Sequence, residues 1–308
     1  AWIKAHDYIK RGFIRYYDNE GHEVELPGYA PTYQMDQALG FIEEHKDEPF
    51  CVMLSWQPPH PPYNGAPPEW EAYYQDRRVE LRPNVPGEYA NEQLVAHYRG
   101  HFAHISALDT EMGRLLDRLE ALGIADNTIV VYTSDHGDLL RSHGELWKRW
   151  PWEESIKVPF IIRWPGHIPQ GQRSDLLLGT PDIGPTLLGL LGEPTPLEMQ
   201  GLDMSEGVLG RSYEGPESAL IMYIRPPGGN YMTQKMPQLV DYRGVRTKRY
   251  TYTRRRDDAQ VTPWQLYDNA EDPYQLRNLI DDPAHADTKQ WLAEELDRWL
   301  SFVGERFE

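Results

Sequence analysis

The chain has 308 residues, a length that favours about two domains, and 40% of them are hydrophobic, which is enough for a sizeable core. Its 48 Asp and Glu residues outnumber its 31 Lys and Arg residues, so the formal net charge at pH 7 is −17. Such a field repels phosphate backbones and argues against nucleic-acid binding. Any anionic substrate would therefore need local cations or a metal in its pocket.

The first half of the chain alternates apolar runs with helical patterns. Apolar residues at helical spacing predict helices over residues 32–44 and 91–122, and Gly123 ends the second. Apolar runs predict buried strands over residues 50–54, 128–132 and 158–163. Cys51 is the single cysteine, so an internal disulfide framework is excluded, and its position predicts an inert, buried strand residue. Strand, long helix and strand in this order favour a parallel α/β sheet.

The C-terminal part has a different pattern. A helix interrupted by Gly and Pro is predicted over residues 174–191, and the composition changes after Gly210. Beyond it, short β segments and one amphipathic helix predict a small antiparallel α+β subdomain; they cover residues 219–224, 245–254, 265–267 and 287–307. We therefore expect an α/β domain over residues 1–210 and an α+β subdomain over residues 211–308.

Residues 133–155 read "TSDHGDLLRSHGELWKRWPWEES" and directly follow the second apolar strand. In open α/β sheets, ligands bind beyond the carboxyl ends of strands. Asp135 and His136 could bind a cation there, and the alternative is an ordinary turn with a surface histidine. Lys148 could neutralise a substrate oxyanion, whereas a lysine among tryptophans is more often a surface residue. His143 is a weaker candidate for substrate binding.

A histidine and an arginine elsewhere are further candidates. His60 lies in "SWQPPHPPY", where prolines stiffen the loop that follows the first apolar strand. It could donate a proton to a leaving group, or it could simply pack among Pro and Tyr. Arg225, with Tyr223 and the loop at residues 226–229, could form a wall that selects the substrate.

Three segments together resemble the sulfatase family of the alkaline-phosphatase superfamily, over about residues 32–279. They are "SWQPPHPPY", "YTSDHGDLLRSHGELWKRWPWEESIKVPFIIRWPG", and "YRGVRTKRYTYTRR" followed by "WQLYDNAEDPYQLRNL". The resemblance implies a sandwich with a mostly parallel central sheet and a smaller C-terminal subdomain. It also implies that Asp135 and His136 are metal ligands, and that Lys148 and His60 contact the sulfate ester and take part in catalysis.

Three features of the family have no match in this sequence, and one of them is its Gly-Lys-Trp-His segment. The nucleophile motif is Cys/Ser-x-Pro-x-Arg, whose first residue becomes formylglycine, and neither Cys51 nor any serine begins such a motif. The family's first pair of metal-binding aspartates is also absent. We therefore expect the C-terminal part of a sulfatase, catalytically incomplete as given, whose nucleophile lies upstream. The expected metal is Ca²⁺, and the imidazole of His136 leaves Mn²⁺ or Zn²⁺ open.

The expected function is hydrolysis of a small sulfate ester or a sulfated glycan. Alternatives are a phosphonate monoester hydrolase or phosphodiesterase of the same superfamily, and an inactive homologue that binds anions or glycans. No apolar run approaches the roughly 20 residues of a membrane span. The chain shows no signal peptide and does not begin with Met, so this end does not indicate a compartment. We favour a periplasmic or secreted protein over a cytoplasmic one. The sequence does not indicate an oligomeric state.

Overall fold

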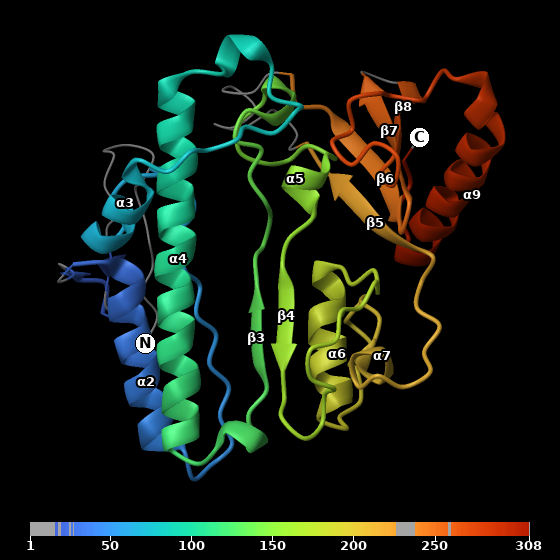
Figure 1. The fold of residues 1–308 in the computed structure, drawn as a ribbon. Helices are drawn as coiled ribbons and strands as arrows, with labels where there is room; N and C mark the ends of the chain where they lie inside the picture. Colours follow the sequence, from blue (N-terminus) through green and yellow to red (C-terminus); the bar gives the residue numbers. More distant parts are fainter. Residues whose placement is uncertain are drawn as a thin grey trace. The chain divides into compact units, whose positions relative to one another are not determined.

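The structure, a computed structural model, describes residues 16–17, 20–24, 26, 28–225, 238–257 and 260–307. Contacts divide the chain into two compact units (Figure 1). One comprises Ala1–Glu80 and Asn91–Thr128, and the other comprises Leu81–Ala90 and Ile129–Glu308. No helix in the described ranges is both long enough and apolar enough to cross a membrane.

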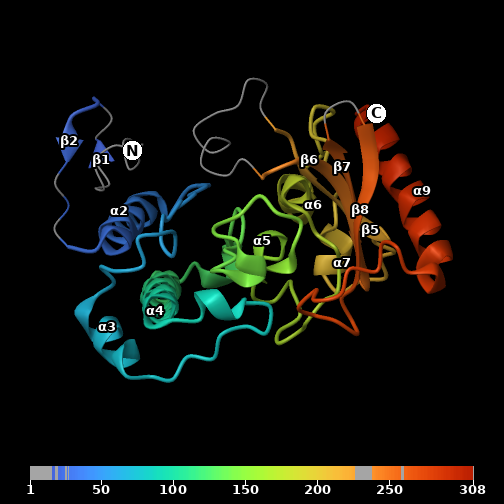
Figure 2. The same cartoon turned by 90° about the horizontal axis from the view of Figure 1, so that it is seen from above.

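Two helices that pack side by side, α2 and α4, form the core of the first unit (Figures 1 and 2). Helix α2 buries Met35, Ala38 and Ile42, which share one face because they are three, four and seven residues apart. Helix α4 begins after Asn91, whose side chain accepts a hydrogen bond from the Leu94 amide at 3.0 Å. The unit's helices and strands are α2 (Ala30–His45), α3 (Pro68–Gln75), α4 (Glu92–Ala121), β1 (Tyr16–Tyr17) and β2 (Glu23–Val24), with a 3-10 turn over Ala125–Asn127. The predicted helices over residues 32–44 and 91–122 are confirmed.

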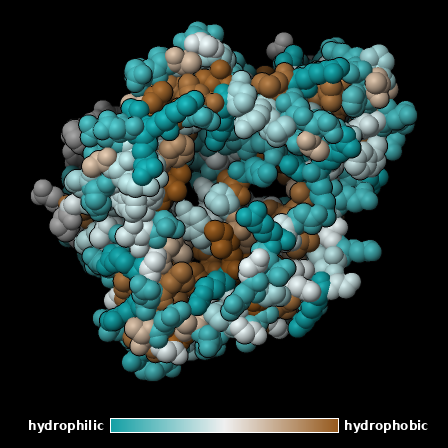
Figure 3. Space-filling view, in the orientation of Figure 1, coloured by the Kyte–Doolittle hydropathy of each residue, from teal (hydrophilic) through white to brown (hydrophobic). Residues whose placement is uncertain are grey.

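The strand predicted over residues 50–54 is wrong. This segment has no regular secondary structure, and Cys51 is exposed rather than buried. The side chain of Met53 is 90% exposed. An apolar run becomes a strand only where another strand takes up its backbone hydrogen bonds, and no described strand pairs with this segment. Brown areas in the space-filling view show that apolar side chains also reach the surface elsewhere (Figure 3).

In the second unit, strands β3 (Val130–Thr133) and β4 (Phe160–Arg163) form an antiparallel pair. The register runs from Val130 opposite Arg163 to Thr133 opposite Phe160. The parallel pairing that the sequence predicted is therefore not found: all described strand pairs are antiparallel. The reason is that the chain reverses between β3 and β4 instead of crossing over through a helix. The α/β class itself is confirmed.

Short helices complete this part of the second unit. The helix predicted over residues 174–191 starts later, as a 3-10 turn over Thr180–Asp182 that leads into α6. The Asp182 side chain accepts hydrogen bonds from the amides of Gly179 and Leu202, at 2.7 and 2.8 Å, and so stabilises this start. The remaining elements are α5 (Glu153–Ile156), α6 (Ile183–Leu190), α7 (Ser205–Val208) and 3-10 turns over Gly87–Tyr89 and Ser142–Gly144.

The C-terminal residues form a four-stranded antiparallel sheet in the order β5-β6-β7-β8, as predicted. Helix α9 covers one face of this sheet (Figure 2). Leu292, Leu296 and Leu300 of α9 pack on apolar residues of the sheet, including Val245 and Tyr252. The segment predicted as one strand over residues 245–254 instead contains the turn between two antiparallel strands, β6 and β7. The bounds are β5 (Ser218–Tyr223), β6 (Asp241–Thr247), β7 (Tyr250–Asp257), β8 (Gln260–Asp268) and α9 (Ala286–Val303), with a 3-10 turn over Pro283–His285.

Candidate active site

The chain turns sharply after β3, and Asp135 and His136 lie on this turn. The Nε2 atom of His136 is 3.3 Å from Oδ2 of Asp135. Its Nδ1 atom is 2.8 Å from the carbonyl oxygen of Gly137 and must donate to it, because a carbonyl only accepts. In the neutral ring, Nε2 then presents a lone pair to a carboxylate. Such a pair of facing acceptors requires a proton or a cation between them.

Gly137 brings α5 against this turn. Its amide donates to the carbonyl oxygen of Ser155 at 2.9 Å. A Cβ atom at position 137 would lie 2.0 Å from the carbonyl oxygen of Glu154, closer than atoms can approach. Only glycine therefore allows the Asp135–His136 turn to contact the backbone of α5.

The loop that follows contains unusual backbone angles. Leu140, Arg141, His143, Trp147 and Arg149 all have positive φ, between 43° and 82°, although none is glycine. Two backbone hydrogen bonds hold this winding: the Leu139 amide to the Trp147 carbonyl at 2.7 Å, and the Arg141 amide to the Glu145 carbonyl at 2.9 Å. Left-handed non-glycine residues cost about 1–3 kcal/mol each, and such strain concentrates at functional sites.

Lys148 lies within this strained loop and is half-buried. Burial and the neighbouring Arg149 lower the pKa of its ammonium group, while the charges of Asp135 and Asp138 act in the opposite direction. The predicted metal ligand Asp135 and the predicted sulfate-binding lysine are therefore close enough to interact electrostatically.

The Asp135–His136 pair fits two ligands of one divalent cation. Adjacent ligands about 2.1–2.4 Å from a metal lie roughly 3 Å apart, which matches the 3.3 Å between these two atoms. A metal-binding histidine also commonly donates its other ring N–H to a carbonyl, as His136 does. Nowhere in the described ranges do three His, Cys, Asp or Glu side chains gather as a metal site. Ca²⁺ takes six to eight oxygens, so further ligands would be required.

His143 is packed rather than open to solvent. Its ring stacks on Trp152 with centroids 4.2 Å apart and an angle of 10° between the planes. The side-chain nitrogen of Asn84 lies 3.1 Å from Nε2 of His143. Burial lowers the pKa of this histidine, against the charges of Glu154 and Asp272. These contacts suit a neutral histidine that supports the loop, and contact with substrate stays a prediction.

Contacts distant in the sequence anchor α5, and the residues that make them were not predicted from the sequence. Gln275 is 1% exposed; its Oε1 accepts from the Glu153 amide at 3.0 Å, and its Nε2 donates to Asn269 at 2.9 Å. Arg246 donates to both carboxylate oxygens of Glu153, each at 3.0 Å. Gln275 stands within the segment "LYDNAEDPYQLRNL", but a pairing over 122 residues leaves no local signal.

Asn84 makes a third such anchor. Its side-chain nitrogen lies 2.7 Å from Oε1 of Glu154 and 3.0 Å from the carbonyl oxygen of Tyr274, in addition to its contact with His143. Asn84 is 5% exposed, so these contacts replace water at its side-chain nitrogen. The anchors hold α5, and with it the turn at Gly137, in one position.

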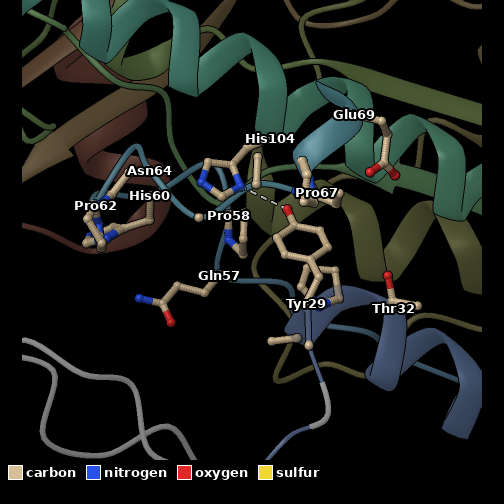
Figure 4. Close-up of a pocket in the computed structure, with 16 residues that line it drawn as sticks. Tyr29, Thr32, Gln57, Pro58, His60, Pro62, Asn64, Pro67, Glu69 and His104 are labelled. Atoms are coloured by element: carbon tan, nitrogen blue, oxygen red, sulfur yellow. Dashed lines mark hydrogen bonds between the residues drawn. The ribbon is translucent and has the colours of Figure 1, made fainter. Parts of the chain in front are cut away.

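His60 belongs to the first unit and lines a pocket of about 560 Å³ there (Figure 4). Its Nδ1 donates to the carbonyl oxygen of Pro61 at 2.8 Å, which fixes the ring, and its amide donates to Gln57 O at 3.0 Å. Tyr29 points its hydroxyl at His104, 2.9 Å from Nδ1 (Figure 4). Burial lowers the pKa of His104, while the carbonyl of Asn64 acts in the opposite direction.

Arg225 is exposed at the end of β5, and its amide lies 3.3 Å from Oδ1 of Asp241. The predicted specificity loop at residues 226–229 lies outside the described residues. Tyr223 packs against Tyr242, with ring centroids 6.4 Å apart. A role for Arg225 in substrate binding stays a prediction.

Comparisons with known proteins identify the family. The sulfatase model matches residues 4–193, and the model for the C-terminal region of N-sulphoglucosamine sulphohydrolase matches residues 142–301. An ulvan-active sulfatase of Formosa agariphila is 36% identical over 99% of this chain, which spans 58% of that relative's length. Most of this chain therefore matches, whereas a large part of the relative has no counterpart in it.

Solved structures agree with this result. A Bacteroides thetaiotaomicron protein of glycosaminoglycan metabolism, BT33494S-sulf, is 28% identical, with a TM-score of 0.81 over 94% of this chain and 63% of that one. The phosphonate monoester hydrolase of Agrobacterium radiobacter shares the fold, with 23% identity and a TM-score of 0.74 over 89% of this chain and 60% of that one. The sulfatase model alone covers more than half of the sequence. The chain therefore belongs to the sulfatase family.

Proposed function

We propose that this chain carries the sulfate-binding part of the active site of a sulfuric ester hydrolase. The observation that carries the proposal is the electrostatic attraction between the half-buried Lys148 and Asp135, whose carboxylate lies 3.3 Å from the His136 ring on the turn after β3. A half-buried cation beside two potential metal ligands is suited to a tetrahedral anion in a chain of net charge −17.

In this reaction Lys148 binds oxygens of the sulfate group and stabilises the charge that accumulates on them as the ester bond breaks. Its partial burial strengthens this interaction, because less water competes for the oxygens. Asp135 and His136 hold a divalent cation, Ca²⁺ in our proposal, with Mn²⁺ or Zn²⁺ as alternatives. When bound, this metal supplies Lewis-acid polarisation of the sulfate oxygens.

His60 is proposed to assist the leaving group. Its Nδ1 donates to the Pro61 carbonyl, so the protonated ring carries its second N–H on Nε2. That proton can pass to the departing alcohol oxygen. The proposed nucleophile is a formylglycine from an upstream segment, since no Cys/Ser-x-Pro-x-Arg motif occurs among these residues.

The proposed substrate class is a sulfated glycan, with small sulfate esters as the alternative. Support comes from the relatives, whose names refer to ulvan and to glycosaminoglycan metabolism. We further propose a periplasmic or secreted location and a boundary near residue 210 between catalytic domain and C-terminal subdomain.

Aryl sulfate hydrolysis tests the proposal, with calcium and with manganese. We expect no turnover by the chain as given, and turnover once the upstream segment is included. In the longer protein, Lys148→Ala should lower kcat/KM by about 10²–10³-fold, because a charge-stabilising donor is lost. Lys157→Ala removes a 71%-exposed cation of the same segment and should leave activity nearly unchanged. Multiple turnover by the short chain that survives Cys51→Ala and disappears in Lys148→Ala would show that a nucleophile lies within these residues.

Two other functions are separable by experiment. A phosphonate monoester hydrolase or phosphodiesterase would prefer an aryl phosphonate or phosphodiester over the matched aryl sulfate. The shared fold with the Agrobacterium enzyme motivates this comparison. An inactive binding homologue would bind sulfated glycans but hydrolyse neither substrate, even with the upstream segment present.

A further inference from the structure

Arg149, the residue after Lys148, has no carboxylate partner in the part of the chain that the structure describes. Its Nη1 atom is buried and has no hydrogen-bond partner among the described residues, and none of the ion pairs in those residues includes it. Its backbone amide donates to Oγ of Ser155 at 3.1 Å. A buried guanidinium N–H without an acceptor costs free energy.

Several other arginines of this unit pair with carboxylates, although the Nη1 atoms of Arg82 and Arg163 are also buried without a hydrogen-bond partner among the described residues. Arg243 is 3% exposed on its side chain and pairs with Asp241 and Glu305, and Arg246 pairs with Glu153. Such pairs are expected because acids outnumber basic residues in the chain. An arginine with a buried nitrogen and no carboxylate therefore needs another source of negative charge.

Lys148, the neighbouring cation of the loop, also has no acceptor for its charge among the described residues. Lys148 has no hydrogen bond or ion pair within the described ranges, and Asp135 and Asp138 act on it only through longer-range attraction. The charge of Arg149 lowers the pKa of Lys148, so the two cations lie near each other and repel. Two adjacent, partly buried cations that have no acceptor among the described residues would be stabilised by an anion that contacts both.

The backbone maintains this unfavourable arrangement. Trp147 and Arg149, on either side of Lys148, have φ values of 66° and 82°. The bond from Arg149 N–H to Ser155 fixes the loop against the segment that follows it. Contacts with the surrounding structure thus hold Trp147 and Arg149 in a backbone conformation that neither residue favours by itself.

We propose that Arg149 acts with Lys148 as a second cation that binds the sulfate oxygens, a role that deepens and rests on the proposed function. The guanidinium group offers parallel N–H donors in a plane, which match two oxygens of a tetrahedral oxyanion. Lys148 supplies a point charge to the same group. Arg149 thus contributes to the selection of a tetrahedral anion over a neutral or halide ligand.

Sulfate binding by the purified chain tests this role without any need for a nucleophile. Calorimetry with sodium sulfate, against sodium chloride at matched ionic strength, should show saturable binding of sulfate. Arg149→Gly removes the cation and keeps the backbone, since glycine accepts a φ of 82° readily. We expect this variant to weaken sulfate binding about tenfold or more, with an unchanged or higher Tm. Arg149→Lys should retain part of the affinity.

Lys157→Gln is the matched control, since it removes an exposed cation of the same segment and should change sulfate affinity less than about twofold. Wild-type affinity in Arg149→Gly would overturn the proposal, as would an equal loss in Lys157→Gln or an absence of saturable binding in the wild type. Failure of the hydrolysis test with intact Arg149-dependent sulfate binding would instead leave this inference standing and refute only the sulfatase activity.

Discussion

At the scale of single residues, the site depends on backbone positions that most side chains cannot occupy. Gly137 allows close contact with Glu154, and the left-handed residues Trp147 and Arg149 lie on either side of Lys148. Candidate roles for Asp135, His136 and Lys148 could be predicted from the sequence, because their residue types and their position after a predicted strand indicate metal and anion binding. The sequence did not show the left-handed residues, because nothing in leucine, tryptophan or arginine favours positive φ.

Gly137→Ala tests the close approach at the turn. The added Cβ would lie 2.0 Å from a backbone carbonyl that cannot move aside alone, so we expect the second unit to lose about 2–4 kcal/mol of stability. Gly113→Ala is the control, since this helical glycine has no atom within 4 Å of the added Cβ and should gain about 0.5–1 kcal/mol. Urea unfolding measures both, and a Gly137→Ala variant as stable as the wild type would contradict the geometry.

At the scale of elements, helix α5 links the site to the C-terminal sheet. The Glu153 amide donates to Gln275, the Glu153 carboxylate accepts from Arg246, and the Glu154 carboxylate accepts from Asn84. The side chain of Glu153 is 13% exposed, so its pairing with Arg246 is largely shielded from water. A four-residue helix has little stability of its own, so these tertiary contacts are needed to keep α5 helical.

Gln275→Ala should therefore destabilise the second unit by about 2–3 kcal/mol, because the buried Glu153 amide and Asn269 lose their partner. Gln290→Ala provides the comparison: this exposed glutamine of α9 bonds only to Glu294, at 3.0 Å, and its loss should cost less than about 0.5 kcal/mol. Thermal unfolding of the two variants checks the difference. Equal small effects would mean that Gln275 does not hold α5.

Helices were easier to predict from the sequence than strands. The apolar spacing of α2 and α4 is a local property, and the caps at Asn91 and Gly123 mark the ends of α4. Strand pairing depends on partners elsewhere in the chain. The apolar run at residues 50–54 therefore gave a wrong strand, and the order of elements gave a wrong direction for the pairing of β3. The antiparallel C-terminal sheet was predictable because its strands follow one another closely.

At the scale of the whole molecule, two electrostatic effects act on stability in opposite directions as pH falls. The net charge of −17 at pH 7 destabilises the folded chain by self-repulsion, which weakens as pH approaches the isoelectric point near 5.1. Burial lowers the pKa values of His104 in the first unit and of His143 in the second. The unfolded chain therefore binds protons on these residues at a higher pH than the folded chain does.

The sign of the histidine effect follows from this difference. Above about pH 6.5 the two histidines are neutral in both the folded and the unfolded state, and their contribution to stability is fully present. Below this pH the unfolded state binds protons first, so the free energy of unfolding falls until the pH has passed the lower pKa of the folded state. The slope is at most about 1.4 kcal/mol per pH unit for each histidine. In 0.2 M NaCl, which screens the self-repulsion, we expect Tm to decrease from pH 7 to pH 5.5, and to decrease less in 10 mM salt. His143→Asn removes one titrating group and should flatten the decrease for the second unit, whereas a Tm that rises towards pH 5.5 at high salt would show that the two buried histidines do not control the pH dependence.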